Sequence, residues 1–293
     1  MAKGAPARER PKLPGYWIAI LALAVALVAS TVTNVVLVLG LTQTGDTSFM
    51  EPTDPPDGDA QRAWITVPSK NTKPGAMIVD VHVDYQCPIC KLAENAFADA
   101  FARLSDRGDI VLRYHTRTFL DGNLRNDSST RAAIAAACVD VADSTKYAAY
   151  HAAIFASQPS EGVGFSDQQL RLQFANTAGL KGKALTKFQT CYDSRATATW
   201  VKDVETNSIG TAKSKTSPPL YLYGGNDPLY YDAQGQMTDA ANGTQSGVHS
   251  TPTIYVNGKP LSLGALFTVS GNDTVPRIGT DADSLFAVLR QVA

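Results

Sequence analysis

Hydrophobic and polar positions divide the chain into a long apolar segment near its start and a globular part beyond it. In the globular part, short runs that are rich in apolar and β-branched residues predict strands. They cover residues 63–67, 76–83, 109–117 and 252–258, and a further strand is expected over roughly 261–270. Asn257-Gly258 predicts a tight hairpin turn at the end of the 252–258 strand.

Helical spacing of apolar residues takes over directly after residue 87, and Gly108 ends that predicted helix. Between Ser128 and Asn207 no strand is predicted. Ala-rich amphipathic segments there indicate helices over 129–142, 146–157, 166–177, 181–192 and 194–207, and a last helix is expected over 282–292. The order of elements favours an α/β fold with a sheet covered on both faces and a helical insertion at about 128–207.

The apolar segment near the start is long enough to cross a membrane. Residues 16–41 contain no charged side chain, and Tyr16 and Trp17 stand where an interfacial aromatic belt would lie. Residues 1–15 are basic, so we expect them to form a cytoplasmic tail and the rest of the chain to lie outside the cell membrane. The alternative is a cleaved signal peptide, whose apolar region is typically shorter, about 7–15 residues.

Composition separates a linker from the exported domain. Residues 42–62 are rich in Asp, Pro, Gly and Thr and predict a flexible spacer, so the globular domain is expected over 63–293. The formal net charge of −1 and the modest aromatic content do not indicate a nucleic-acid surface, and no nucleic-acid partner is expected.

The chain has four cysteines, and two of them, Cys87 and Cys90, are separated only by Pro88 and Ile89. Structural zinc usually requires two close pairs of Cys or His ligands, and no second pair of that kind is present, so no metal site is expected. A purely structural disulfide is the second interpretation, but so small a loop removes little entropy from the unfolded chain.

Redox chemistry fits the sequence around the pair better. The pair follows a predicted strand and begins a predicted helix, where unpaired backbone N–H groups stabilise a thiolate at Cys87 and lower its pKa. Cys90 would lie one turn further on, within reach for a disulfide, and Pro88 suits the first turn because it has no N–H to leave unpaired. A thiol with a lowered pKa is a good leaving group, so Cys87 could pass the disulfide on to a substrate.

The sequence resembles the DsbA-like branch of the thioredoxin superfamily. The resemblance is carried by "DYQCPICK" (84–91), by the helical block and by "VHSTPTIYVNG" (248–258), and it covers roughly residues 63–293. It implies a thioredoxin fold with an inserted helical domain and the activity of a thiol-disulfide oxidoreductase, and no cofactor is expected. It also implies that Thr251-Pro252 is a cis peptide beside the cysteines, where the backbone of Thr251 pairs with substrate.

One position departs from that family. Many relatives carry a buried acidic residue six positions before the first cysteine, where this chain has Val81. Strand alternation points Asp80 and Asp84 to the face opposite Val81. We interpret Asp84 as a solvated charge at the strand end, with tuning of the site as the alternative, and the proton acceptor for Cys90 stays unassigned.

Cys138 and Cys191 are isolated in predicted helices. In an oxidising compartment such a remaining pair tends to be bridged, so a structural disulfide is expected, with two buried free thiols as the alternative. Closing a loop of about fifty residues stabilises a fold by roughly 4 kcal/mol in the chain-entropy model.

Three functions remain open from the sequence. The first is an oxidase that donates disulfides to unfolded or reduced exported proteins and is reoxidised by a membrane quinone-linked partner. The second is a disulfide isomerase or reductase that a membrane electron donor keeps reduced. The third is a non-catalytic thioredoxin-fold binding or chaperone module, which the presence of both Cys87 and Cys90 disfavours.

Overall fold

The computed structural model describes residues 64–208, 229–231, 237–238, 244–246, 250–271 and 273–293. The expected basic tail, membrane helix and linker, residues 1–62, lie outside these described residues, and those predictions therefore stay open. Within the described residues, no helix is both long enough and apolar enough to span a membrane.

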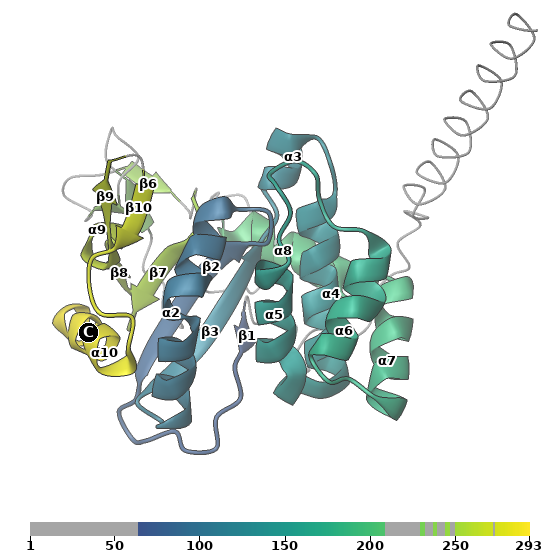
Figure 1. Cartoon of the computed structure of the whole chain (residues 1–293), viewed down its shortest axis with the longest axis horizontal. Helices are drawn as coiled ribbons and strands as arrows, with labels where there is room; N and C mark the ends of the chain where they lie inside the picture. Colours follow the sequence, from purple (N-terminus) through teal and green to yellow (C-terminus); the bar gives the residue numbers. More distant parts are fainter. Residues whose placement is uncertain (1–63, 209–228, 232–236, 239–243, 247–249, 272) are drawn as a thin grey trace, which may run out of the picture. The chain divides into compact units, whose positions relative to one another are not determined.

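A five-stranded sheet forms the centre of the fold (Figure 1). Its strand order is β1 (Ile65–Thr66), β3 (Ile110–Arg117), β2 (Met77–Asp84), β7 (Thr253–Val256) and β8 (Lys259–Leu261). The central strands β2 and β3 are parallel, and every other neighbouring pair in this sheet is antiparallel. The connection between the parallel strands is helix α2 (Pro88–Asp106), which agrees with the predicted strand, helix, strand unit.

One face of the central strands is apolar and packs against α2. Val81 and Tyr114 are partners in the β2–β3 register and share this face, and Tyr114 donates a hydrogen bond from its hydroxyl to Glu94 of α2. The buried side of α2 supplies Phe97 and Phe101 to the same core. The C-terminal helix α10 (Ala282–Val292), predicted at these residues, packs beside α2.

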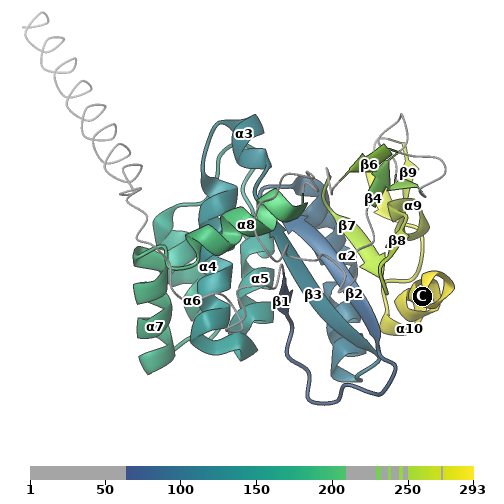
Figure 2. The same ribbon diagram turned by 180° about the vertical axis from the view of Figure 1, so that it is seen from behind.

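The opposite face of β2 and β3 is polar yet buried. Asp80 receives two hydrogen bonds from the Arg113 guanidinium, both at 2.6 Å, and lies 2.8 Å from Nε2 of His115. Further along β3, Arg117 pairs with Glu205 of α8 (Ala198–Ser208), which lies on the side of the sheet away from α2 (Figure 2). Because each of these charges has a partner, this face can be buried at a tolerable desolvation cost.

Helices follow β3 up to residue 208, as the sequence predicts for residues 128–207. Two short elements were not predicted, the helix α3 (Leu120–Leu124) and the 3-10 turn η2 (Ser144–Lys146). The remaining helices are α4 (Ser128–Asp143), α5 (Tyr147–Ala156), the π-helical turn η3 (Gln169–Gln173), α6 (Phe174–Thr177), α7 (Gly182–Asp193) and α8. The six residues 132–137 of α4 are fully buried, and all but one are alanines, whose small side chains allow α5, α7 and α8 to pack closely around this helix.

The region near the C-terminus corrects one predicted strand. Residues 261–270 are the end of β8, a short helix α9 (Leu263–Leu266) and strand β9 (Phe267–Ser270), which pairs with the unpredicted β10 (Asp273–Pro276). The prediction was wrong because the Ser262 side chain accepts a hydrogen bond from the Gly264 N–H and so begins a helical turn. The hairpin turn was correct, since Asn257 and Gly258 have φ values of 50° and 79°. A separate sheet pairs β5 (Met237–Thr238), β4 (Leu229–Tyr231) and β6 (Thr244–Ser246).

Candidate active site

Cys87 lies at the junction between β2 and α2. It is the N-cap of α2 with extended backbone (φ −74°, ψ 119°), and Pro88 is in the first turn, as predicted. Its backbone N–H donates to the carbonyl of Asp84 at 3.0 Å, which closes the turn that follows the strand. The side chain therefore faces the N-terminal end of a 19-residue helix, where backbone N–H groups are unpaired.

The pKa values of the two thiols in this pair are shifted in opposite directions. Cys87 and Cys90 are both free and buried. A hydrogen bond from the Cys90 thiol is the main cause that lowers the pKa of Cys87 to about 6, against the opposing effect of burial. The Thr251 contact and the backbone N–H groups of Cys90 and Ile89 lower it further. Burial, followed by the proximity of Cys87, raises the pKa of Cys90 well above its usual value. At neutral pH the pair thus holds one thiolate and one thiol.

The segment before β7 lies against Cys87. The Thr251–Pro252 peptide is cis, as the family resemblance implied, and the Cys87 thiol lies 3.3 Å from the Thr251 carbonyl oxygen. Because β7 pairs with β2, this segment lies next to the end of the strand that carries the cysteine pair. The structure therefore brings together residues that are separated by 164 positions in the sequence.

The β2 position of the family's buried acid is occupied by Val81. Val81 is 3% exposed and faces the apolar core, and Asp80 and Asp84 point the other way, as predicted. The description of Asp84 as a solvated charge was wrong, because its carboxylate is fully buried. It accepts hydrogen bonds from the Ser129 hydroxyl at 2.6 Å and from the backbone N–H groups of Gln86 and Leu120. Burial raises the pKa of Asp84 to about 7, against the lowering effect of these bonds.

Gln86, immediately before the cysteine, joins this buried cluster. Its side-chain nitrogen lies within 2.9 Å of oxygens of Asp121, Asn126 and Ser129, and the Asn126 amide donates back to its side-chain oxygen. Burial also raises the pKa of Asp121. The cluster connects the end of β2 to α3 and to the start of α4.

A second glutamine binds the same turn from the other direction. Gln158, two residues after α5, donates from its side-chain nitrogen to the backbone carbonyls of Tyr85 and Cys87, at 2.8 and 3.0 Å. The Lys91 ammonium donates to the backbone carbonyl of Gln158 at 2.9 Å.

A buried chain of polar groups runs from Tyr85 towards α2. The Tyr85 hydroxyl lies 3.0 Å from Nδ1 of His151, and Nε2 of that ring lies 3.2 Å from a carboxylate oxygen of Glu94. Sequence reasoning missed these side chains, and Gln86 and Gln158 as well. Their partners are tens of residues away, so no local pattern in the sequence identifies them.

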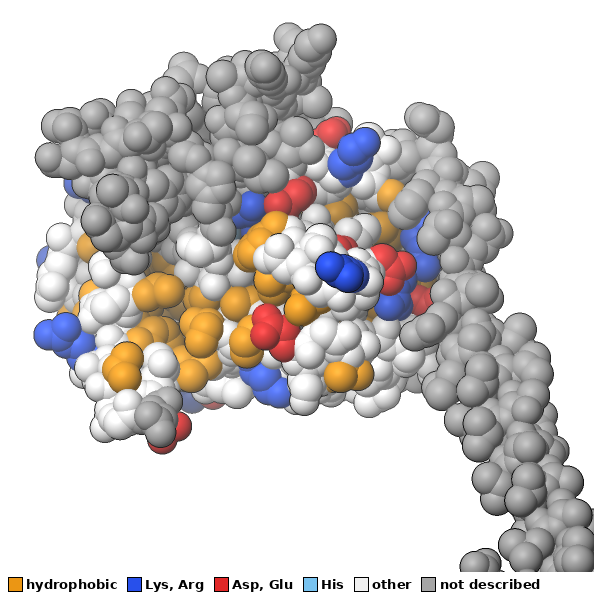
Figure 3. All heavy atoms as spheres, turned by 90° about the horizontal axis from the view of Figure 1, so that it is seen from above, with side chains coloured by type: hydrophobic (Ala, Val, Ile, Leu, Met, Phe, Trp, Pro, Cys, Tyr) orange, Lys and Arg blue, Asp and Glu red, His pale blue; other side chains and the backbone are white. Residues whose placement is uncertain are grey.

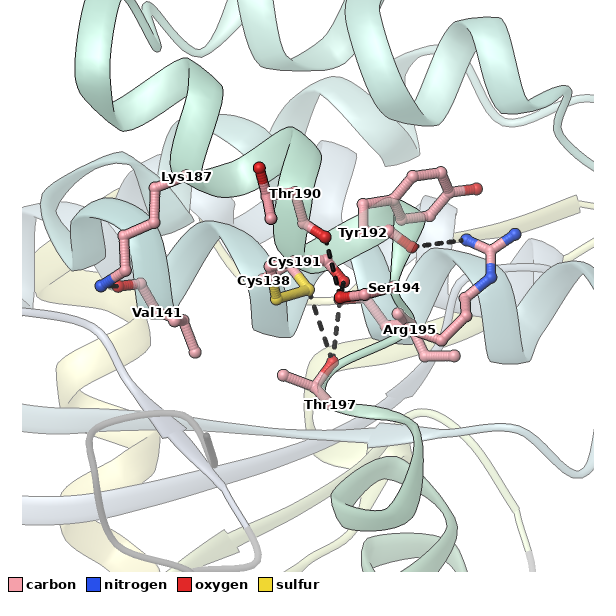
Figure 4. The surroundings of a disulfide bond; sticks show 10 residues. Cys138, Val141, Lys187, Thr190, Cys191, Tyr192, Ser194, Arg195 and Thr197 are labelled. Atoms are coloured by element: carbon pink, nitrogen blue, oxygen red, sulfur yellow. Dashed lines mark hydrogen bonds between the residues drawn. A yellow bond between two sulfur atoms is a disulfide. The ribbon is translucent and has the colours of Figure 1, made fainter. Parts of the chain in front are cut away.

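The other two cysteines form the expected disulfide. Cys138 of α4 and Cys191 of α7 are bridged, with Cα atoms 5.6 Å apart, and both residues are buried (Figure 4). Thr197 lies beside the bridge, with its hydroxyl oxygen 3.7 Å from the Cys138 sulfur, and donates to the carbonyl of Ile134 in α4. The bridge therefore ties two helices of the insertion together.

In the part of the chain that the structure describes, no three or more His, Cys, Asp or Glu side chains are grouped so that they could hold a metal ion.

Hydrophobic side chains gather on the face that is seen when the molecule is viewed from above (Figure 3). Ile89, within the cysteine motif, is 40% exposed.

Comparison with known proteins gives a family match and structural neighbours. The model of a family described as thioredoxin matches residues 74–226. DsbA of Mycobacterium tuberculosis in its reduced form is 25% identical, with a TM-score of 0.46, over 68% of this chain and 85% of that one. MdbA, a thiol-disulfide oxidoreductase from Actinomyces oris, is 16% identical with a TM-score of 0.48, over 74% and 80% of the two chains. BdbD from Bacillus subtilis is 19% identical with a TM-score of 0.45, over 82% and 97%. A search among curated protein sequences found no match.

Proposed function

The chain belongs to the thioredoxin family, and on that premise we propose that it is an extracytoplasmic thiol-disulfide oxidoreductase that donates disulfides to exported proteins. The observation that carries the proposal is the difference in pKa between the two thiols of one buried pair. Cys87 has a pKa lowered to about 6 at the start of a helix, while the pKa of Cys90 is raised. Such a pair favours the dithiol form, because the Cys87 thiolate is stabilised only after the disulfide has been broken.

The reaction would begin with the oxidised Cys87–Cys90 pair. A substrate thiolate attacks the Cys87 sulfur, the bond to Cys90 breaks, and Cys90 takes up a proton because its pKa is high. A second substrate thiolate then attacks the substrate sulfur of the mixed disulfide, and Cys87 leaves as a thiolate. Two electrons pass from substrate to protein, and of the two substrate protons one resides on Cys90 and the other reaches solvent.

The surroundings of Cys87 suit a protein substrate. The Thr251 carbonyl oxygen lies 3.3 Å from the Cys87 sulfur, and in this proposal the backbone of Thr251 pairs with an extended segment of an unfolded chain. Ile89 adds exposed apolar surface. Pro88 and Ile89 lie between the two cysteines, and in this proposal they tune the reactivity of the thiols. In this proposal residues 16–41 anchor the protein in the cell membrane, residues 42–62 form the linker, and a membrane quinone-linked partner reoxidises the pair.

The direction of electron flow separates this proposal from its alternative, a disulfide isomerase or reductase. We expect the reduction potential of the purified domain, equilibrated with glutathione, to be clearly more oxidising than about −270 mV, the value of thioredoxin. We also expect the oxidised protein to introduce disulfides into a reduced, unfolded ribonuclease. Cys87→Ser should lose this activity completely. The double variant Cys138→Ala/Cys191→Ala, which removes the structural disulfide without leaving a free thiol, serves as the cysteine control outside the site. A potential at or below that of thioredoxin, together with no oxidation of ribonuclease, would rule out the oxidase.

A further inference from the structure

The turn between β2 and α2, residues 85–87, is held from two sides by the helical insertion. We call these residues the redox turn. On one side Gln86 reaches the cluster at α3 and α4. On the other side Gln158 binds the backbone of the turn itself, across 73 and 71 residues of sequence. A contact to backbone carbonyls fixes the course of the chain, which a contact to a side chain does not.

Gln158 is itself firmly held. It is 7% exposed, its backbone N–H donates to the carbonyl of Phe155, and its backbone carbonyl accepts from the Lys91 ammonium. Both hydrogens of its side-chain amide are needed to serve the carbonyls of Tyr85 and Cys87. The opposite amide orientation would turn an oxygen towards two carbonyl oxygens, so only one orientation satisfies the site.

We propose that Gln158 is a positioning residue through which the helical insertion holds Cys87 at the start of α2 and sets its redox behaviour. The inference rests on the proposed function, since it concerns the same thiol. By keeping the Cys87 carbonyl turned towards the insertion, Gln158 fixes the residue in its N-cap conformation, with the sulfur facing the N–H groups of Ile89 and Cys90. The amide hydrogens also offset the partial negative charge of the carbonyl oxygens of Tyr85 and of Cys87 itself, the residue that carries the thiolate.

Removing the amide should therefore weaken the thiolate. In Gln158→Leu both carbonyls lose their side-chain donor, the redox turn gains freedom, and the Cys87 thiolate loses part of its stabilisation. The Lys91 contact is unaffected, because it is made to the backbone of Gln158. The effect can then be assigned to the amide and not to the loss of a nearby cation.

The test compares Gln158→Leu and Gln158→Glu with Gln291→Leu, which alters an exposed glutamine in α10. Thiolate absorbance against pH and equilibration with glutathione are measured on the whole exported domain. We expect the Cys87 pKa to rise by about one unit, with an equilibrium constant for oxidising glutathione that is roughly tenfold lower, equivalent to about 30 mV. The Gln158→Glu variant should shift at least as far, because a carboxylate donates no hydrogen bond, and Gln291→Leu should match the wild type.

A merely structural role gives a different result. If Gln158→Leu and Gln158→Glu lower the melting temperature but leave the Cys87 pKa and the glutathione equilibrium unchanged, the proposal is overturned. Should the leucine variant fail to fold, Gln158→Asn keeps the amide but is one methylene shorter, and an unshifted pKa in both folded variants, Asn and Glu, overturns it equally. If the wild type itself has an ordinary thiol pKa and no redox activity, the proposed function fails first. An active wild type with unshifted variants refutes only the role of Gln158.

Discussion

The two cysteine pairs of this chain contain the same functional group but differ in state and surroundings. Cys87 and Cys90 are three positions apart at the start of a helix and are free thiols with divergent pKa values. Cys138 and Cys191 are 53 positions apart and join the middle of α4 to the end of α7. The first pair lies beside unpaired N–H groups, whereas the second is buried within a bundle of helices.

The difference shows that loop length and local backbone geometry decide what a disulfide does. A bond that closes a very small loop constrains the unfolded chain little, so it can be made and broken at a small cost to stability. A bond across 53 residues constrains it strongly. Helix-start N–H groups stabilise a thiolate only at Cys87, the cysteine that precedes the first turn of its helix.

The first prediction is that removing the Cys138–Cys191 disulfide lowers the stability of the protein but not the reactivity of Cys87. Replacing Cys138 and Cys191 together by alanine should lower the free energy of unfolding by about 4 kcal/mol, as the chain-entropy model gives for a loop of this size. Denaturant titration measures this loss. The Cys87 pKa and the oxidation of reduced ribonuclease, measured where the variant is still folded, should match the wild type. A loss of redox activity in the folded variant would show that the two pairs are not independent.

The second prediction concerns the acidity of the thiols in the reduced protein. Alkylation by iodoacetamide should follow the Cys87 thiolate, with a midpoint near pH 6 in place of the ordinary value of 9.0. Cys90 should react only at much higher pH, because burial raises its pKa, and mass spectrometry of the peptides distinguishes the two sites. A midpoint near pH 9 for both would remove the distinction between this pair and ordinary buried thiols.

The last prediction concerns the pH dependence of stability that arises from Asp84, the residue before the redox turn. Burial raises the pKa of Asp84 to about 7 in the folded protein, from 3.8. Between these values the folded state binds a proton that the unfolded state has released, so stability falls as pH rises from about 4 to about 7. The slope from this group approaches, at most, about 1.4 kcal/mol per pH unit.

Asp84→Asn should remove most of that fall, and denaturant titrations at several pH values between 4 and 7 measure it. Some slope should persist because burial also raises the pKa of Asp121. Asp106→Asn provides a matched control at the far end of α2 and should retain the wild-type slope. An Asp84→Asn variant with the wild-type slope would contradict the assignment of the titration to Asp84.

Much of the fold and the centre of the site could be predicted from the sequence. Periodicity identified β2, β3 and the helices between residues 128 and 208, because hydrophobic spacing is imposed by local geometry. The cysteine spacing, together with Pro88 and the change from strand to helix, indicated the position of Cys87 at a helix start. The resemblance to the thioredoxin superfamily supplied the cis peptide at Thr251–Pro252, which local chemistry alone does not specify.

The helical insertion shows what only the tertiary structure decided. Asp84 looked like a surface charge because its neighbours in sequence say nothing about Ser129 and Leu120, which cover it only when the insertion folds back over the strand end. Gln86 and Gln158 looked like ordinary polar residues for the same reason. The sequence by itself determined where the reactive thiol would be. Contacts between residues 35 to 73 positions apart determined what surrounds and holds it, because such contacts depend on packing and leave no local periodic signal.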